Sequence, residues 1–246
     1  MLFSIYAWSV ILIVVGAFMP MMIVAMTLRL PRSWIWAAGR VVYRTAFFLI
    51  GVRIKTQGIE ALDKNAPMIF MCNHVSLLDP FIFCCAFKKP IVGVEKRENF
   101  KIPMYGWLMK KWGMIPIERK DVVQARKDLQ KAAETLREDR AWVVMLPEGT
   151  RTANGELGPF KKGAAHLAID TKIDVCAFTQ HNAYRVKNKN SWKIRPGTID
   201  IDVHTPVDPR EFEPGTLTNK IREDILERLR LGPKRLESRT EKQISA

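Results

Sequence analysis

The pattern of hydrophobic and polar positions divides the chain into two parts. Residues 2–28 carry no charge and are mostly large and apolar, a run longer than the ~20 residues needed to cross a hydrocarbon core. A second apolar stretch, 34–50, is interrupted by Arg40 and Arg44. From Gly51 onward, short apolar runs alternate with segments of helical periodicity. The pattern predicts N-terminal membrane-embedded helices over 1–50, followed by one globular domain over 51–246.

Strands and helices alternate in the predicted domain. Apolar runs predict strands at 52–58, 68–72, 91–94, 114–117, 142–146 and 175–180, and 198–204 alternates as a late or edge strand does. Helical spacing predicts helices at 77–87, 121–140 and 160–171 and from 218 onward, with Asp121 as an N-cap. This order predicts an α/β fold with a mostly parallel central sheet flanked by helices. In such sheets, ligands bind at the carboxyl ends of the strands.

The apolar N-terminus is typical of a membrane anchor. No basic region precedes the apolar run, which argues against a secretory signal. Pro20 is expected to kink or break the first helix. The arginines after it, Arg29 and Arg32, and the tryptophans Trp34 and Trp36 favour an interfacial second helix facing the cytoplasm. The first helix either spans the bilayer or forms a hairpin with the second in one leaflet.

Composition and charge limit the classes of partner that the chain is expected to bind. With 48% hydrophobic and 26% charged residues the chain is globular, and its net charge of +14 indicates an anionic partner. The segment 88–127 holds eleven Lys and Arg against four Asp and Glu, with aromatic and Met residues between them. A nucleic-acid groove has this composition, but the membrane segment favours anionic lipid and a phosphorylated or thioester substrate.

The cysteines and histidines do not indicate a metal site. Four cysteines lie in apolar surroundings without C-x-x-C spacing, which predicts buried, reduced thiols: Cys72, Cys84, Cys85 and Cys176. The histidines other than His74 are scattered and form no ligand spacing: His166, His181 and His204. We therefore expect neither disulfides nor a catalytic metal.

A histidine and an aspartate follow the strand predicted at 68–72, in the stretch N-H-V-S-L-L-D. A carboxylate five residues after a histidine can reach the imidazole across one turn and fix its tautomer. His74 and Asp79 could then take a proton from a hydroxyl. The chain contains no G-x-S-x-G elbow, so that hydroxyl would belong to the substrate. The alternative is a structural loop histidine, preceded by a helix-capping Asn73.

Two further polar clusters follow predicted strands. In L-P-E-G-T-R, Gly149 lets backbone amides approach a ligand, Arg151 offers a fork for phosphate, and Glu148 can hold a hydroxyl or an arginine. In G-M-I-P-I-E-R-K, Arg119 again follows a strand. Either cluster could also be an ordinary turn.

These blocks resemble the ordered motifs of the glycerolipid acyltransferases. The N-H-x4-D block comes first, then V-E-K-R through G-M-I-P-I-E-R, then P-E-G-T-R followed by P-F-K-K-G-A. The most similar branch is the bacterial 1-acyl-glycerol-3-phosphate (lysophosphatidate) acyltransferases, and the resemblance runs from about Gly51 to Asp208. The fourth motif departs from the family's proline-bearing pattern, because Val175 to Gln180 reads V-C-A-F-T-Q.

The resemblance implies a role for each matching position. His74 would be the general base and Asp79 its orienting carboxylate. The positions implied to bind substrate, in order along the chain, are Lys96, Arg119, Glu148, Gly149 and Arg151. Arg119 among them would bind the phosphate of the acceptor.

The expected reaction follows from the resemblance. An acyl group would pass from acyl-CoA or acyl-carrier protein to the 2-hydroxyl of 1-acyl-glycerol 3-phosphate, without a cofactor beyond the thioester co-substrate. The partners would be the lysophospholipid, the thioester donor and membrane lipids, at the cytoplasmic face of a bacterial inner membrane. Another acceptor, such as glycerol 3-phosphate, another lysophospholipid or a lyso-aminolipid, remains open, as does a non-catalytic basic membrane-binding protein. Nucleic acid is not an expected partner.

Overall fold

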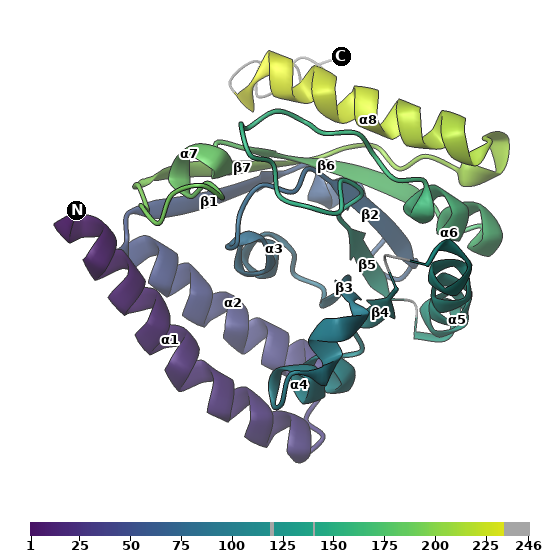
Figure 1. Cartoon of the computed structure of the whole chain (residues 1–246). Helices are drawn as coiled ribbons and strands as arrows, with labels where there is room; N and C mark the ends of the chain where they lie inside the picture. The colour runs from purple at the N-terminus through teal and green to yellow at the C-terminus, as the bar shows by residue number, and fades with distance from the viewer. Residues whose placement is uncertain (119–120, 140, 234–246) are drawn as a thin grey trace.

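A seven-stranded sheet forms the centre of the molecule, with helices on both faces (Figure 1). The computed structural model describes residues 1–118, 121–139 and 141–233. Helices α5, α6 and α8 cover one face, and α3, α2 and α1 form successive layers on the other (Figure 1).

The bounds of the elements follow in chain order. The strands are β1 (Val52–Gln57), β2 (Met68–Cys72), β3 (Ile91–Lys96), β4 (Ile115–Ile117), β5 (Trp142–Met145), β6 (Val175–His181) and β7 (Gly197–Val203). The α-helices are α1 (Leu2–Thr27), α2 (Arg32–Leu49), α3 (Asp79–Ala86), α4 (Tyr105–Trp112), α5 (Val122–Asp139), α6 (Gly163–Thr171), α7 (Ala183–Val186) and α8 (Pro214–Leu231). Short 3-10 turns are η1 (Ile59–Ala61), η2 (Arg97–Lys101) and η3 (Pro209–Glu211).

The sheet order is β1-β7-β6-β2-β5-β3-β4. Strands β2 to β6 run parallel to one another, so the prediction of a mostly parallel sheet is confirmed. Strand β7 is antiparallel to β6 and parallel to β1, and it lies inside the sheet rather than at its edge. Its alternating pattern arises because Ile199 and Ile201 are buried while Thr198 and Asp200 are only partly covered. The edge placement considered from the sequence is therefore wrong.

The centre of the core is aromatic. Phe70 of β2 lies within 5.1 to 6.0 Å, between ring centroids, of Phe87, Trp142 and Phe178. All four side chains are essentially inaccessible to solvent, and burying a large apolar side chain contributes roughly 1.5–3 kcal/mol. This cluster fixes β2, β5 and β6 against one another. The polar residues that follow these strands are therefore attached to a rigidly packed part of the sheet.

Two local predictions are confirmed. The carboxylate of Asp121 accepts hydrogen bonds from the backbone N–H groups of Val123 and Gln124 at 2.9 and 3.0 Å, which is the predicted N-cap of α5. The four cysteines are buried, as their apolar surroundings in the sequence predicted.

The first helix continues through Pro20. Helix α1 runs unbroken from Leu2 to Thr27, so the predicted break is wrong, although the proline cannot donate to the Gly16 carbonyl. Phe18 and Met26 are buried on either side of the proline, and packing against α2 holds both halves of the helix in line. The helix is long and apolar enough to cross a membrane, and most of its apolar side chains are exposed or only partly buried.

Helix α2 joins the N-terminal helices to the domain. Trp36 stacks on Trp112 with ring centroids 5.8 Å apart and donates to the Phe87 carbonyl at 2.8 Å, whereas Trp34 is exposed. The guanidinium of Arg44 donates to the Cys85 carbonyl at 3.1 Å. Because α2 packs on both α3 and β1, residues before and after 50 share one core. A boundary at 50/51 stays a prediction.

The N-terminal end of α1 contacts the α/β domain. The hydroxyl of Ser4 donates to the Ile194 carbonyl and accepts from the Ile194 N–H, both at 3.3 Å. The indole N–H of Trp8 donates to the Trp192 carbonyl at 2.7 Å. Figure 1 shows the loop after α7 beside this end of the helix. The N-terminal end of α1 is therefore held against the α/β domain.

Candidate active site

His74 and Asp79 form a hydrogen-bonded pair in the loop between β2 and α3. The Nδ1 atom of His74 lies 2.8 Å from Oδ2 of Asp79, whose side chain is fully buried. The same carboxylate accepts from the backbone N–H groups of Val75 and Ser76, each at 3.0 Å. Asp79 is also the first residue of α3, where the positive end of the helix dipole favours a carboxylate. These contacts fix the acid before any substrate arrives.

The pair determines which nitrogen of His74 is basic. An ionised carboxylate can only accept, so Nδ1 carries the proton and Nε2 keeps its lone pair. The side chain of His74 remains 21% exposed, which leaves one part of the ring accessible. The arrangement can therefore take a proton from a hydroxyl group that approaches Nε2.

Glu148 and Thr152 hold the backbone of His74 from the loop after β5. Oε1 of Glu148 accepts the His74 N–H at 2.6 Å, and its Oε2 accepts the Gly158 N–H at 2.9 Å. The N–H of Thr152 donates to the His74 carbonyl at 2.9 Å. Burial raises the pKa of the Glu148 carboxyl, although the two backbone N–H groups act in the opposite direction. Both oxygens of Glu148 are thus engaged within the protein, and its predicted binding of substrate stays a prediction.

Asn73 and Gln180 tie the same loop to β6. The Asn73 side chain accepts from the Gln180 N–H at 2.8 Å and donates to the Gln180 carbonyl at 3.1 Å. The Gln180 amide donates to the Asn73 carbonyl at 2.8 Å. The sequence offered a helix-capping role for Asn73, and its hydrogen bonds are instead made across the sheet. The sequence drew attention to Gln180, because this residue ends the segment that departs from the family's fourth motif. It did not indicate that Gln180 would pair with Asn73.

Gly149 and Arg151 lie in the same loop after β5 as Glu148 and Thr152. Gly149 has φ +71°, a left-handed conformation that favours glycine, and a Cβ there would come within 3.2 Å of the Lys161 ammonium. Arg151 is half-buried and immediately precedes Thr152, which bonds His74. The structure thus brings His74, Asp79, Glu148, Gly149 and Arg151 together.

The remaining predicted positions are less closely connected. Lys96 ends β3 and pairs with Glu98, with Nζ–Oε1 at 3.2 Å, and β5 separates its strand from β2. Arg119 lies outside the described residues; β4, which precedes it, ends at Ile117. Within the described ranges, no three His, Cys, Asp or Glu side chains are grouped to hold a metal ion.

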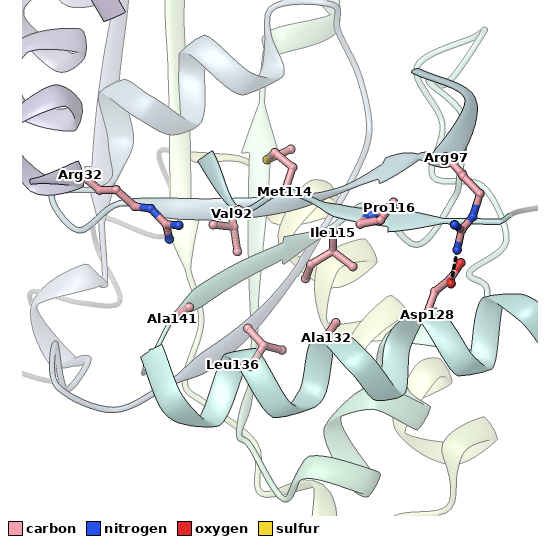
Figure 2. A pocket seen from close by; sticks show the side chains of 11 residues that line it. Arg32, Val92, Arg97, Met114, Ile115, Pro116, Asp128, Ala132, Leu136 and Ala141 are labelled. Atoms are coloured by element: carbon pink, nitrogen blue, oxygen red, sulfur yellow. Dashed lines mark hydrogen bonds and ion pairs between the residues drawn. The ribbon is translucent and has the colours of Figure 1, made fainter. Parts of the chain in front are cut away.

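A separate cleft of about 390 Å³ lies between α5 and strands β3 and β4 (Figure 2). Its middle is apolar, with Val92, Ile115 and Leu136 pointing into it, and Arg32 lies at one end (Figure 2). The ion pair of Arg97 and Asp128 lies at the other end. The cleft shares no residue with the His74 site.

The chain resembles known proteins along most of its length. A family model described as Acyltransferase matches residues 53–179. The 1-acyl-sn-glycerol-3-phosphate acyltransferase of Borreliella burgdorferi is 30% identical over 77% of this chain and 77% of its own length. The enzymes of the same name from Pseudomonas aeruginosa and coconut are 32% and 29% identical over 61% and 71% of this chain. The matches span 58% and 56% of those two relatives.

A solved structure supports the fold. The crystal structure of the 1-acyl-sn-glycerophosphate (LPA) acyltransferase PlsC from Thermotoga maritima aligns with a TM-score of 0.75 and 23% identity, over 91% of this chain and 92% of that one. The family match covers the ends of β2 and β5, where the His74 and Glu148 loops begin. On this match and on the identity with the Borreliella relative, the chain belongs to the acyltransferase family.

Proposed function

We propose that this protein transfers an acyl group from a thioester to the 2-hydroxyl of 1-acyl-glycerol 3-phosphate, producing phosphatidic acid. The observation that carries the proposal is the His74–Asp79 pair, with Nδ1–Oδ2 at 2.8 Å and the imidazole partly accessible. The names of the curated relatives support the same acceptor.

The steps follow from the tautomer of His74. Nε2 takes the proton of the lipid hydroxyl while the oxygen attacks the thioester carbonyl, and a tetrahedral oxyanion forms. The carbon–sulfur bond then breaks, and the imidazolium returns its proton to the thiolate. The products are phosphatidic acid and a free thiol, and no acyl group is attached to the protein. The absence of a G-x-S-x-G elbow and the buried, hydrogen-bonded hydroxyl of Ser76 are consistent with direct transfer.

In this proposal, cationic side chains and the backbone at Gly149 bind the acceptor. Arg151 and Arg119 bind the phosphate, the backbone at Gly149 allows close approach of the ligand, and Lys96 adds positive charge at the same edge of the sheet. Glu148 contributes by holding the His74 backbone. The donor is acyl-CoA or acyl-carrier protein, and both are anionic partners that suit a chain of net charge +14.

An acceptor panel tests the proposal. Purified protein in lipid vesicles is given lysophosphatidate, glycerol 3-phosphate, a lysophosphatidylcholine or a lyso-aminolipid, each with acyl-CoA or acyl-carrier protein. We expect lysophosphatidate to give the highest kcat/KM with at least one donor. A higher kcat/KM for an acceptor without a phosphate monoester would contradict the proposed substrate.

We further propose that α1 and α2 attach the protein to one leaflet on the cytoplasmic face of the inner membrane. If α1 crossed the bilayer, Ser4 and Trp8 could not reach residues 192–194 of the domain that carries the active site. The test labels Ser9→Cys and Thr27→Cys variants, both exposed positions, with an impermeant maleimide in sealed vesicles. We expect both to react from the cytoplasmic side only, while the buried native cysteines stay unlabelled. Labelling of the two sites from opposite sides would overturn the one-leaflet arrangement.

A further inference from the structure

Lys187 is a buried cation that the proposed mechanism does not yet use. Its side chain is 5% exposed and its ammonium donates to the Asn188 carbonyl at 2.6 Å. The ring of Trp8, from α1, lies 5.9 Å from the same ammonium, within the range of a cation–π contact. Among the described residues, no carboxylate forms a salt bridge with Lys187. A lysine this deeply buried is rarely left without a counter-ion.

A second cation, Arg151, lies in the loop after β5, which is hydrogen-bonded to the loop that carries Lys187. Burial lowers the pKa of Lys187, and the positive charge of Arg151 lowers it further, so the two groups repel each other in the free protein. Arg151 also forms no salt bridge within the part of the chain that the structure describes. Two neighbouring cations without a carboxylate, one of them buried, are the arrangement that binds an anion.

The elements around this pair hold it in place. The Tyr184 hydroxyl and the Asn190 amide both donate to the Ala153 carbonyl, at 2.8 and 2.7 Å, and so join the loop after β6 to the loop after β5. The Trp8 indole N–H, bonded to the Trp192 carbonyl at 2.7 Å, fixes α1 over the same loop. Lys187 and Arg151 are therefore presented from two rigidly connected loops and covered by the membrane helix.

We propose that Lys187 and Arg151 together bind the phosphate monoester of the acceptor, and that Trp8 closes this site from the side of α1. The inference rests on the proposed function and adds to it a residue and an element that no sequence motif indicated. The N-terminal helix then acts as part of the acceptor site as well as a membrane anchor.

The position of the cations favours the acceptor over the donor as the source of the phosphate. In lysophosphatidate the phosphate is attached to the carbon next to the one that bears the reacting hydroxyl. A phosphate site for the acceptor must therefore adjoin His74, and Arg151 immediately precedes Thr152, whose N–H bonds the His74 carbonyl. In CoA, the pantetheine arm separates the phosphates from the thioester.

The test compares Lys187→Met with Lys193→Met, which removes an exposed charge from the same loop. Full-length proteins are assayed for kcat and for KM toward lysophosphatidate and the thioester donor. We expect Lys187→Met to raise the KM for lysophosphatidate on the order of tenfold to a hundredfold, the loss of one charge-assisted hydrogen bond. The KM for the donor and the behaviour of Lys193→Met should not change. An unchanged acceptor KM, or a rise in the donor KM instead, would overturn the proposal.

A binding measurement separates this inference from the proposed reaction. Inorganic phosphate should raise the Tm of the wild-type protein above that in chloride of equal ionic strength, and Lys187→Met should lose this shift. If phosphate raises the Tm of the wild type but the wild type does not acylate lysophosphatidate, the anion site is supported and the proposed function is contradicted. If phosphate does not stabilise the wild type, the anion site itself is wrong, whether or not the variant folds.

Discussion

Replacing His74 with alanine should lower kcat by about a thousandfold, since general-base catalysis by a positioned side chain contributes on the order of 10²- to 10⁴-fold. The variant keeps Asp79 and its two backbone hydrogen bonds, so the loop should retain its fold. The KM for lysophosphatidate should stay within about twofold, because the imidazole acts on the hydroxyl in the transition state and contributes little to ground-state binding. Steady-state assays in vesicles, with Tm measured in parallel, check both expectations.

His166→Ala is the matched control for this variant. His166 is a half-buried histidine on α6, and the mechanism gives it no part. We expect its kcat to equal that of the wild type. A His74→Ala protein with wild-type turnover would exclude His74 as the base, whatever the identity of the acceptor.

Replacing Asp79 with asparagine should lower kcat at least as much, on the order of 10³- to 10⁴-fold, as an amide does in place of the aspartate of a catalytic triad. The amide oxygen can still accept from Val75 or Ser76. Its NH₂ group then faces Nδ1 of His74 and donates to it, so the ring proton moves to Nε2. The basic lone pair is lost while the imidazole stays in position.

Glu148→Gln provides a graded comparison with Asp79→Asn. One oxygen of Glu148 would become an NH₂ group facing the N–H of His74 or Gly158, which displaces the loop without changing the tautomer of His74. We expect kcat to fall on the order of 10²-fold at most, because the His74 imidazole would be only modestly misplaced. An Asp79→Asn variant less impaired than Glu148→Gln would contradict the tautomer argument.

The local part of the site could be predicted from the sequence. His74 and Asp79 lie five residues apart across one turn, so their contact depends on the short loop and the helix start that the spacing indicates. The order of the strands along the chain was also readable, because each parallel strand carries a nearly continuous apolar run. The position of Glu148 directly after a buried strand could be predicted from the same apolar pattern, whereas the pairing of that strand with β2 could not.

The long-range contacts could not be predicted. Asn73 and Gln180 are separated by 107 positions, and their pairing depends on β6 lying beside β2 in the sheet, which the periodicity of neither segment specifies. Trp8 and Trp192 are separated by 184 positions, and a uniformly apolar helix such as α1 gives no sign of which face meets the domain. Lys187 is locally an ordinary basic residue. Its burial follows from where α1 and two loops meet.

Mass spectrometry of the reaction mixture tests the central claim most directly, namely that His74 activates the lipid's own hydroxyl for direct acyl transfer. Purified wild-type protein is incubated with the thioester donor, alone and together with lysophosphatidate. The account predicts that phosphatidic acid forms only when both substrates are present, and that the donor alone leaves the mass of the protein unchanged. A protein that gains the mass of the acyl group, or a complete mixture without phosphatidic acid, would contradict it.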